Sequence, residues 1–104
     1  MHRDIKPENV LMESSDLTDL RIKLIDFGTA IEYASMTKLK EIFGSSYYIA
    51  PEIIQESYDE KCDIWSLGVV AFVILSGSAP FNGKTDIDIM NKVSQGKYEF
   101  KRIL

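Results

Sequence analysis

The most hydrophobic part of the chain is the stretch from Lys61 to Ser76, which is apolar on nearly every face of a helix. Asp59 and Glu60 precede it, where acidic side chains favour a helix N-terminus, and Gly77 follows it, where glycine commonly ends a helix. A helix that is apolar all round is usually covered on all sides. We therefore expect a central, buried helix over about residues 61–76.

A membrane span is the alternative for this region, because no charged residue occurs between Ile64 and Asn82. Small polar residues, glycines and a proline interrupt the run, and the part from Trp65 to Leu75 is too short to cross a bilayer. We therefore expect a helix in the interior of a globular domain and no membrane segment.

Two apolar runs separated by a polar turn predict a β-hairpin near the N-terminus. Val10 to Met12 are suited to a buried strand, and residues 21–25 alternate in polarity as a return strand does. Serine, threonine and aspartate supply most of the residues between them, as is typical of a turn. The hairpin would bring Asn9 at one end and Asp26 at the other side by side.

Two further helices are expected. Pro51 suits the first turn of a brief helix. A longer helix should run from Thr85, whose hydroxyl can cap it, to about Gln95, with Gly96 ending it.

Length and charge narrow the class of protein. The chain has 104 residues, which is one domain at most, and its net charge of −4 comes from interspersed acids and bases, which disfavours a nucleic-acid binder. The single cysteine, Cys62, cannot form an internal disulfide, which suits a reducing compartment. No secretory signal pattern opens the chain. We expect an intracellular, cytoplasmic protein.

The residues from His2 to Asn9 concentrate the candidate chemistry. Pro7 prevents a regular helix here, and in an extended loop Asp4 and Lys6 point the same way. Phosphoryl transfer uses three groups of this kind. They are a carboxylate that takes a proton, an ammonium near a phosphate and an amide oxygen, here that of Asn9, for a hard metal ion. Taken alone, the segment could also be a charged surface loop.

Four motifs together resemble the catalytic loop, the metal-binding motif, the end of the activation segment and the central helix of eukaryotic protein kinases. In order, they are His2–Asn9, Asp26–Gly28, Ala50–Glu52 and Asp63–Gly68. Lys6, two residues after Asp4, matches the serine/threonine kinases. The resemblance covers essentially the whole chain. It implies an α+β fold that is part of a kinase C-terminal lobe, mostly helical, with a short hairpin carrying the catalytic and metal-binding motifs.

The resemblance also implies the roles of individual residues. Asp4 would orient and deprotonate the substrate hydroxyl, Lys6 would neutralise the moving phosphate, and Asn9 and Asp26 would hold Mg²⁺. Leu11 would form the apolar floor under adenine, with ordinary core packing as the alternative. The implied ATP-binding residues are Lys6, Glu8, Asn9, Leu11 and Asp26.

Packing roles follow from the same resemblance. Phe27 would lie beside His2 in a purely structural contact. Asp63 would accept hydrogen bonds from the backbone around His2 and Arg3.

Residues 30–46 match the activation loop of the family. Glu41 stands where many kinases carry a phosphorylated threonine, so its carboxylate could pair with Arg3 without modification. Ser45 stands where a threonine usually contacts Asp4 and Lys6. Hydroxyls that could be phosphorylated are those of Ser35, Thr37, Ser45 and Ser46.

Three segments, residues 44–52, 58–63 and 76–83, are most similar to the calcium/calmodulin-regulated branch, and within it to the calcium-dependent protein kinases of plants and protists. No Asp-x-Asp-x-Asp-Gly loop occurs in the chain, so calcium dependence rests on the resemblance alone. We expect residues 1–104 to be a partial kinase domain without the N-terminal lobe and the last helices.

We expect the parent to phosphorylate protein substrates with ATP and Mg²⁺, and the isolated chain to be inactive. The alternatives are a catalytically dead kinase-like scaffold and a binding unit that self-associates through uncovered core.

Overall fold

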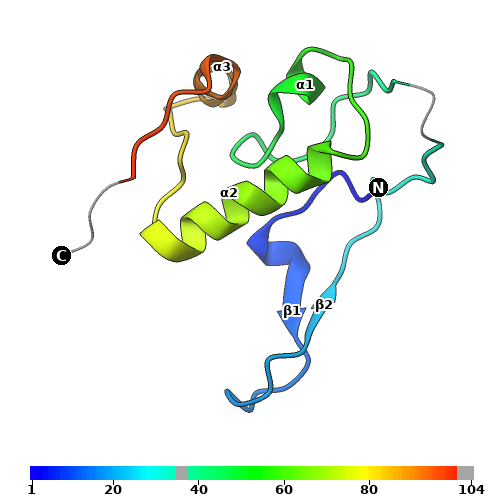
Figure 1. The fold of residues 1–104 in the computed structure, drawn as a ribbon, viewed down its shortest axis with the longest axis vertical. Coiled ribbons are helices and arrows are strands. Elements are labelled where there is room, and N and C mark those ends of the chain that lie inside the picture. The colour runs from blue at the N-terminus through cyan, green and yellow to red at the C-terminus, as the bar shows by residue number, and fades with distance from the viewer. Residues whose placement is uncertain (35–37, 101–104) are drawn as a thin grey trace.

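The computed structural model describes residues 1–34 and 38–100. Its longest helix crosses the middle of the molecule, with a hairpin extending away on one side and two shorter helices on the other (Figure 1). In chain order the elements are the 3₁₀ helix η1 (Pro7–Asn9), strands β1 (Val10–Met12) and β2 (Ile22–Leu24), and helices α1 (Pro51–Ile54), α2 (Cys62–Ser76) and α3 (Asp86–Gln95). This arrangement confirms the expected α+β class.

Strands β1 and β2 form the predicted antiparallel hairpin, in which Val10 pairs with Leu24 and Met12 with Ile22. The expectation of a buried first strand is wrong in the described part of the chain, because Leu11 and Met12 are 49% and 53% exposed. The physical reason is that, within residues 1–34 and 38–100, this sheet has two strands, and every residue of β2 is exposed as well. An apolar run identifies a strand but does not say whether another layer covers it.

Helix α2 begins one residue later than predicted and ends as predicted. Gly77 adopts the left-handed conformation with φ 78°, and its N–H donates to the Val73 carbonyl at 2.8 Å. One face of the helix is buried, whereas Ile64 and Ile74 on the other are 67% and 74% exposed. The helix is therefore central, but the prediction that it is buried all round is wrong among the described residues.

Helix α3 matches its prediction closely and packs against α1. The hydroxyl of Thr85 accepts a hydrogen bond from the Asp88 N–H at 3.2 Å, which caps the helix N-terminus. Gly96 ends the helix with φ 68°. In the described residues, no helix is both long and apolar enough to cross a membrane.

The core consists of two clusters bridged by Ile54 and Trp65. One cluster joins the residues around α1 to the start of α2, and the other joins α3 to Phe81. Their buried members are Ile49, Ala50, Ile53, Tyr58 and Cys62 in the first, and Phe81, Ile89 and Val93 in the second.

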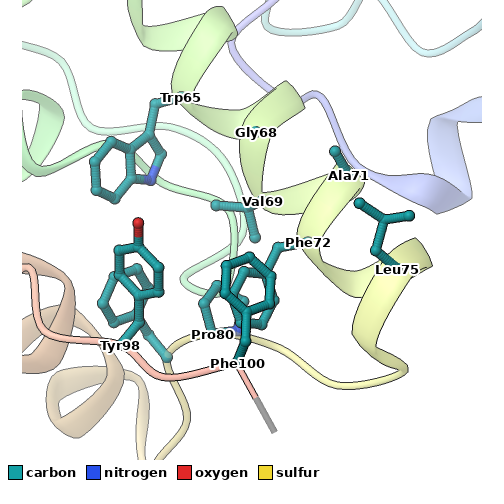
Figure 2. A pocket seen from close by; sticks show the side chains of 10 residues that line it. Trp65, Gly68, Val69, Ala71, Phe72, Leu75, Pro80, Tyr98 and Phe100 are labelled. Atoms are coloured by element: carbon teal, nitrogen blue, oxygen red, sulfur yellow. The ribbon is translucent and has the colours of Figure 1, made fainter. Parts of the chain in front are cut away.

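Beside α2 lies an apolar cavity of about 330 Å³, shown in Figure 2. Phe72 of α2 stacks on Phe100 with ring centroids 4.3 Å apart and meets Tyr98 edge to face. Trp65 stacks on Phe81, and in the part of the chain that the structure describes its buried Nε1 has no hydrogen-bond partner. The aromatic side chains thus fix residues 98–100 against the central helix.

Candidate active site

The backbone of the candidate catalytic loop is anchored to the first turn of α2. The Asp63 carboxylate accepts hydrogen bonds from the N–H of His2 at 2.7 Å and from the N–H of Arg3 at 2.8 Å. Hydrogen bonds to an ionised carboxylate are stronger than those between neutral groups. The predicted role of Asp63 is confirmed, and the loop takes its position from the central helix.

His2 connects the catalytic loop to the end of β2. Its Nδ1 accepts the Asp4 N–H at 3.1 Å, so in the neutral ring the proton lies on Nε2, which donates to the Ile25 carbonyl at 2.9 Å. Phe27 packs edge-on against the ring with centroids 5.1 Å apart. The expected structural contact between His2 and Phe27 is confirmed.

Asp4, Lys6 and Asn9 converge on one another. The Asn9 amide nitrogen donates to the backbone carbonyl of Asp4 at 2.8 Å and approaches its carboxylate oxygen Oδ2 at 3.3 Å. Lys6 Nζ lies 3.5 Å from the same Oδ2 and donates to the Ser45 hydroxyl at 3.0 Å. The contact of Ser45 with Lys6 is thus present, and a carboxylate, an ammonium and an amide share one small volume.

The hairpin places Asp26 at the same end as Asn9. Because Val10 pairs with Leu24 and the Ile25 N–H donates to the Asn9 carbonyl at 2.8 Å, Asp26 follows the residue that pairs with Asn9. Asp26 has φ 58°, a left-handed conformation that aspartate tolerates better than most residues, and its Oδ1 accepts the Gly28 N–H at 3.2 Å. Two residues seventeen positions apart therefore flank the same hairpin end, as predicted.

The Asn9 and Asp26 side chains offer ligands that suit Mg²⁺. An amide oxygen and a carboxylate are hard oxygen donors, and Mg²⁺ in phosphoryl-transfer sites takes few protein ligands beside water and phosphate oxygens. Within residues 1–34 and 38–100, no group of three or more His, Cys, Asp or Glu could hold a metal ion by itself. The donor set fits an ion shared with a nucleotide.

Arg3, the residue before Asp4, is buried against the activation segment. Its Nε donates to the Thr29 carbonyl at 2.6 Å, and its guanidinium carbon lies 4.3 Å from the centroid of the Phe43 ring. The predicted pairing with Glu41 is present at 3.8 Å, between Nη1 and Oε2. Nη1 also donates to the Tyr58 hydroxyl at 3.2 Å, a contact that the sequence did not indicate.

The remaining predicted ATP-binding residues lie at the surface. Glu8 is exposed and Leu11 is half-exposed on β1, so ordinary core packing does not describe Leu11 among the described residues. Burial and, after it, the negative charge of Glu8 raise the pKa of the Tyr48 phenol. Nucleotide contacts by Glu8 and Leu11 stay predictions.

The serines of the activation segment differ in their environment. Ser46 is 8% exposed, and its hydroxyl donates to the Asp86 carboxylate at the start of α3 at 2.7 Å, which sequence patterns did not reveal. Ser35 and Thr37, named above as hydroxyls that could be phosphorylated, lie outside the described residues.

Comparison with known proteins adds two findings. A family model described as "Protein kinase domain" matches residues 1–103. The chain is 50% identical over 100 residues to "Calcium-dependent protein kinase 4" of Plasmodium falciparum (isolate 3D7), covering 96% of this chain and 19% of that protein. It is 43% identical over 101 residues to "Calcium-dependent protein kinase 12" of Arabidopsis thaliana, covering 97% of this chain and 20% of that protein. The chain thus spans about a fifth of the length of these relatives.

Proposed function

Because this chain belongs to the protein kinase domain family, we propose that it supplies the catalytic loop, the metal-binding motif and the activation segment of a serine/threonine protein kinase. The whole protein transfers the γ-phosphoryl group of ATP to serine or threonine hydroxyls of protein substrates. The names of its relatives support calcium regulation of the whole protein. The buried, single Cys62 supports an intracellular, reducing environment.

One observation carries this proposal: Asp4, Lys6 and Asn9 contact one another directly, and Asp26 lies at the same hairpin end. Asn9 and Lys6 both approach Oδ2 of Asp4 and fix its carboxylate, which accepts the proton of the substrate hydroxyl. Lys6 is held by Ser45 beside Asp4, where its positive charge stabilises the transferred phosphoryl group.

The metal and nucleotide sites follow from the same arrangement. Asn9 and Asp26 hold Mg²⁺, which when bound neutralises charge on the ATP phosphates. Glu8 in η1 and Leu11 in β1 contribute to ATP binding together with Lys6. Arg3, Glu41 and Ser45 set the position of the activation segment.

We further propose that residues 1–104 form part of a kinase domain and that the isolated chain does not phosphorylate proteins. No Gly-x-Gly-x-x-Gly pattern occurs in its sequence, and positioning of the phosphates supplies much of the rate enhancement in phosphoryl transfer. The exposed apolar face of α2 supports self-association of the isolated chain.

The test uses the full-length protein that contains this chain, assayed for ³²P transfer from Mg²⁺-ATP to a serine/threonine peptide library. Asp4→Asn should lower kcat by about 10²-fold or more, because general-base catalysis contributes typically that much. Asp16→Asn, at the exposed hairpin turn, is the matched control and should leave kcat unchanged. A wild-type protein that binds ATP yet labels no peptide would instead indicate a kinase-like scaffold.

A further inference from the structure

The activation segment is attached to the rest of the molecule at Tyr58, which lies in the connection between α1 and α2. Tyr58 is only 1% exposed. Its backbone forms an isolated antiparallel bridge with Leu39: the Leu39 N–H donates to the Tyr58 carbonyl at 2.9 Å, and the Tyr58 N–H donates to the Leu39 carbonyl at 3.0 Å. One residue away, Lys38 pairs with Asp59 at 2.8 Å. These contacts hold the beginning of the segment formed by residues 38–43.

The Tyr58 hydroxyl extends this attachment to the catalytic loop. It accepts a hydrogen bond from Arg3 Nη1 at 3.2 Å and donates one to the backbone carbonyl of Glu41. The single phenol oxygen therefore joins the arginine next to Asp4 with the backbone of residues 38–43. A phenylalanine at this position would keep the ring and lose both hydrogen bonds.

The Glu41 carboxylate makes a weaker connection to the same arginine. Its Oε2 lies 3.8 Å from Arg3 Nη1, and the Glu41 side chain is 73% exposed, compared with 4% for the arginine. Water and salt screen such an exposed ion pair, whereas a hydrogen bond inside the protein is screened much less. Beside the contact of its guanidinium with the Phe43 ring, the polar connection of Arg3 to residues 38–43 that is shielded from solvent is therefore the uncharged phenol.

Displacement of residues 38–43 would reach the catalytic groups through the residues that follow. Gly44 has φ 100°, and a side chain there would come within 2.9 Å of the Arg3 carbonyl, so this part of the chain lies directly on the catalytic loop. The next residue, Ser45, holds Lys6. The position of the segment thus determines where the ammonium of Lys6 lies relative to Asp4.

We propose that Tyr58 is a positioning residue whose hydroxyl fixes residues 38–43 of the activation segment on Arg3. This buried, uncharged contact holds the catalytic loop in the position that phosphoryl transfer requires. This inference rests on the proposed kinase function. It predicts a kinase whose turnover responds little to ionic strength, because the contact that positions the loop involves no exposed ion pair.

The experiment compares Tyr58→Phe with Glu41→Gln and Tyr98→Phe in the full-length kinase. Tyr58→Phe should lower kcat about tenfold with little change in the KM for ATP, since a buried hydrogen bond to a charged group is lost. Glu41→Gln should lower kcat less than about threefold, as expected for an exposed ion pair. Tyr98→Phe also removes one phenol hydroxyl, but from a residue that is 55% exposed beside the apolar cavity, and it should leave kcat unchanged.

The dependence of kcat on ionic strength separates a positioning role of Tyr58 from a merely structural role, which would leave this dependence unchanged. Raising salt from about 0.05 to 0.5 M should scarcely alter wild-type kcat. It should lower the kcat of Tyr58→Phe, in which the Glu41 ion pair and the contact with the Phe43 ring are what connect Arg3 to residues 38–43, because salt screens the ion pair. Amide hydrogen exchange of residues 38–43 should rise in Tyr58→Phe, with a modest fall in Tm because Arg3 Nη1 and the Glu41 carbonyl lose the phenol as a partner. A Tyr58→Phe enzyme with wild-type kcat, or a larger loss in Glu41→Gln, would overturn the proposal.

A second variant covers the case in which Tyr58→Phe does not fold. Leu39→Pro removes the N–H that donates to the Tyr58 carbonyl and leaves the buried ring intact, and it should also lower kcat and raise exchange in residues 38–43. Wild-type kcat in a folded Leu39→Pro enzyme would overturn the proposal. If the wild-type protein itself transfers no phosphate, the kinase function fails, while unchanged exchange of residues 38–43 in both variants would separately refute the role of Tyr58.

Discussion

Cys62 shows how strongly the environment of one residue changes its chemistry. It is 1% exposed, and burial, followed by the negative charge of Asp63, raises the pKa of its thiol to about 12. The thiolate is the reactive form of cysteine, so this thiol is inert at neutral pH. The role of Cys62 is therefore to pack in the core at the start of α2.

The raised pKa of Cys62 predicts a decline of stability in alkali. In the unfolded chain the thiol ionises near pH 9.0, whereas in the folded chain it ionises only at about 12, so the unfolded state binds fewer protons between these values. The free energy of unfolding should therefore fall on the order of 1 kcal/mol per pH unit from about pH 9 to 12, and Cys62→Ala should flatten this decline. Urea titrations of the kinase domain at several pH values would check it. Equal slopes for both proteins would contradict it.

Sequence motifs predicted the contacts of individual residues at positions where a chemical role requires one residue type. The contacts of Asp63, the packing of His2 on Phe27 and the bond from Lys6 to Ser45 were all expected. Tyr58 was not expected at Arg3, because it lies in an irregular connection, and only the path of the chain after α1 brings its ring under the activation segment.

At the scale of elements, α2 acts as the platform for the catalytic loop, because Asp63 in its first turn accepts two consecutive backbone N–H groups of the loop. Helix periodicity located α2 to within one residue. It could not show which face is covered, since the helix is apolar all round. The same limit applies to the hairpin, where apolar residues predicted the strands but not their exposure.

Removing the Asp63 carboxylate should disrupt the loop and destabilise the protein. Asp63→Ala leaves the N–H groups of His2 and Arg3 without their acceptor, and an unsatisfied buried group costs about 1–3 kcal/mol. We expect a lower free energy of unfolding and a loss of kcat. Asp63→Asn, which keeps one carbonyl acceptor, should be affected less.

Thermal unfolding and peptide phosphorylation by the full-length kinase would measure both effects. Glu60→Ala removes an exposed acid just before α2 and is the control. If Asp63→Ala is no worse than Glu60→Ala, the helix does not hold the loop.

At the scale of the whole molecule, the described residues expose a large amount of apolar surface. Both strands of the hairpin and one face of α2 contribute to it, with large apolar side chains that are between 38% and 76% exposed. Soluble monomers rarely expose large continuous apolar patches. The large apolar side chains on the exposed face of α2 are Ile64, Leu67, Ile74 and Leu75.

The purified 104-residue chain should therefore self-associate or lack fixed tertiary packing. At about 25 cal/mol per Å², a few hundred Å² of uncovered apolar surface costs several kcal/mol, comparable to the stability of a small domain. Sedimentation velocity should show oligomers, or near-ultraviolet circular dichroism should be weak with strong dye binding. Replacing Leu67 and Ile74 by lysine should reduce association. A wild-type monomer that unfolds cooperatively and binds no dye would refute this expectation.

The bonds from Asp63 to His2 and Arg3 join residues 61 and 60 positions apart, and this separation has a consequence for the order of folding. Closing so long a loop is entropically costly and slow compared with forming a hairpin or a helix. The hairpin and α2 can form early from local interactions, whereas the catalytic loop acquires its native backbone only when α2 docks. Among the described residues, the catalytic loop is thus one of the last parts to become native, although the helix that holds it forms early.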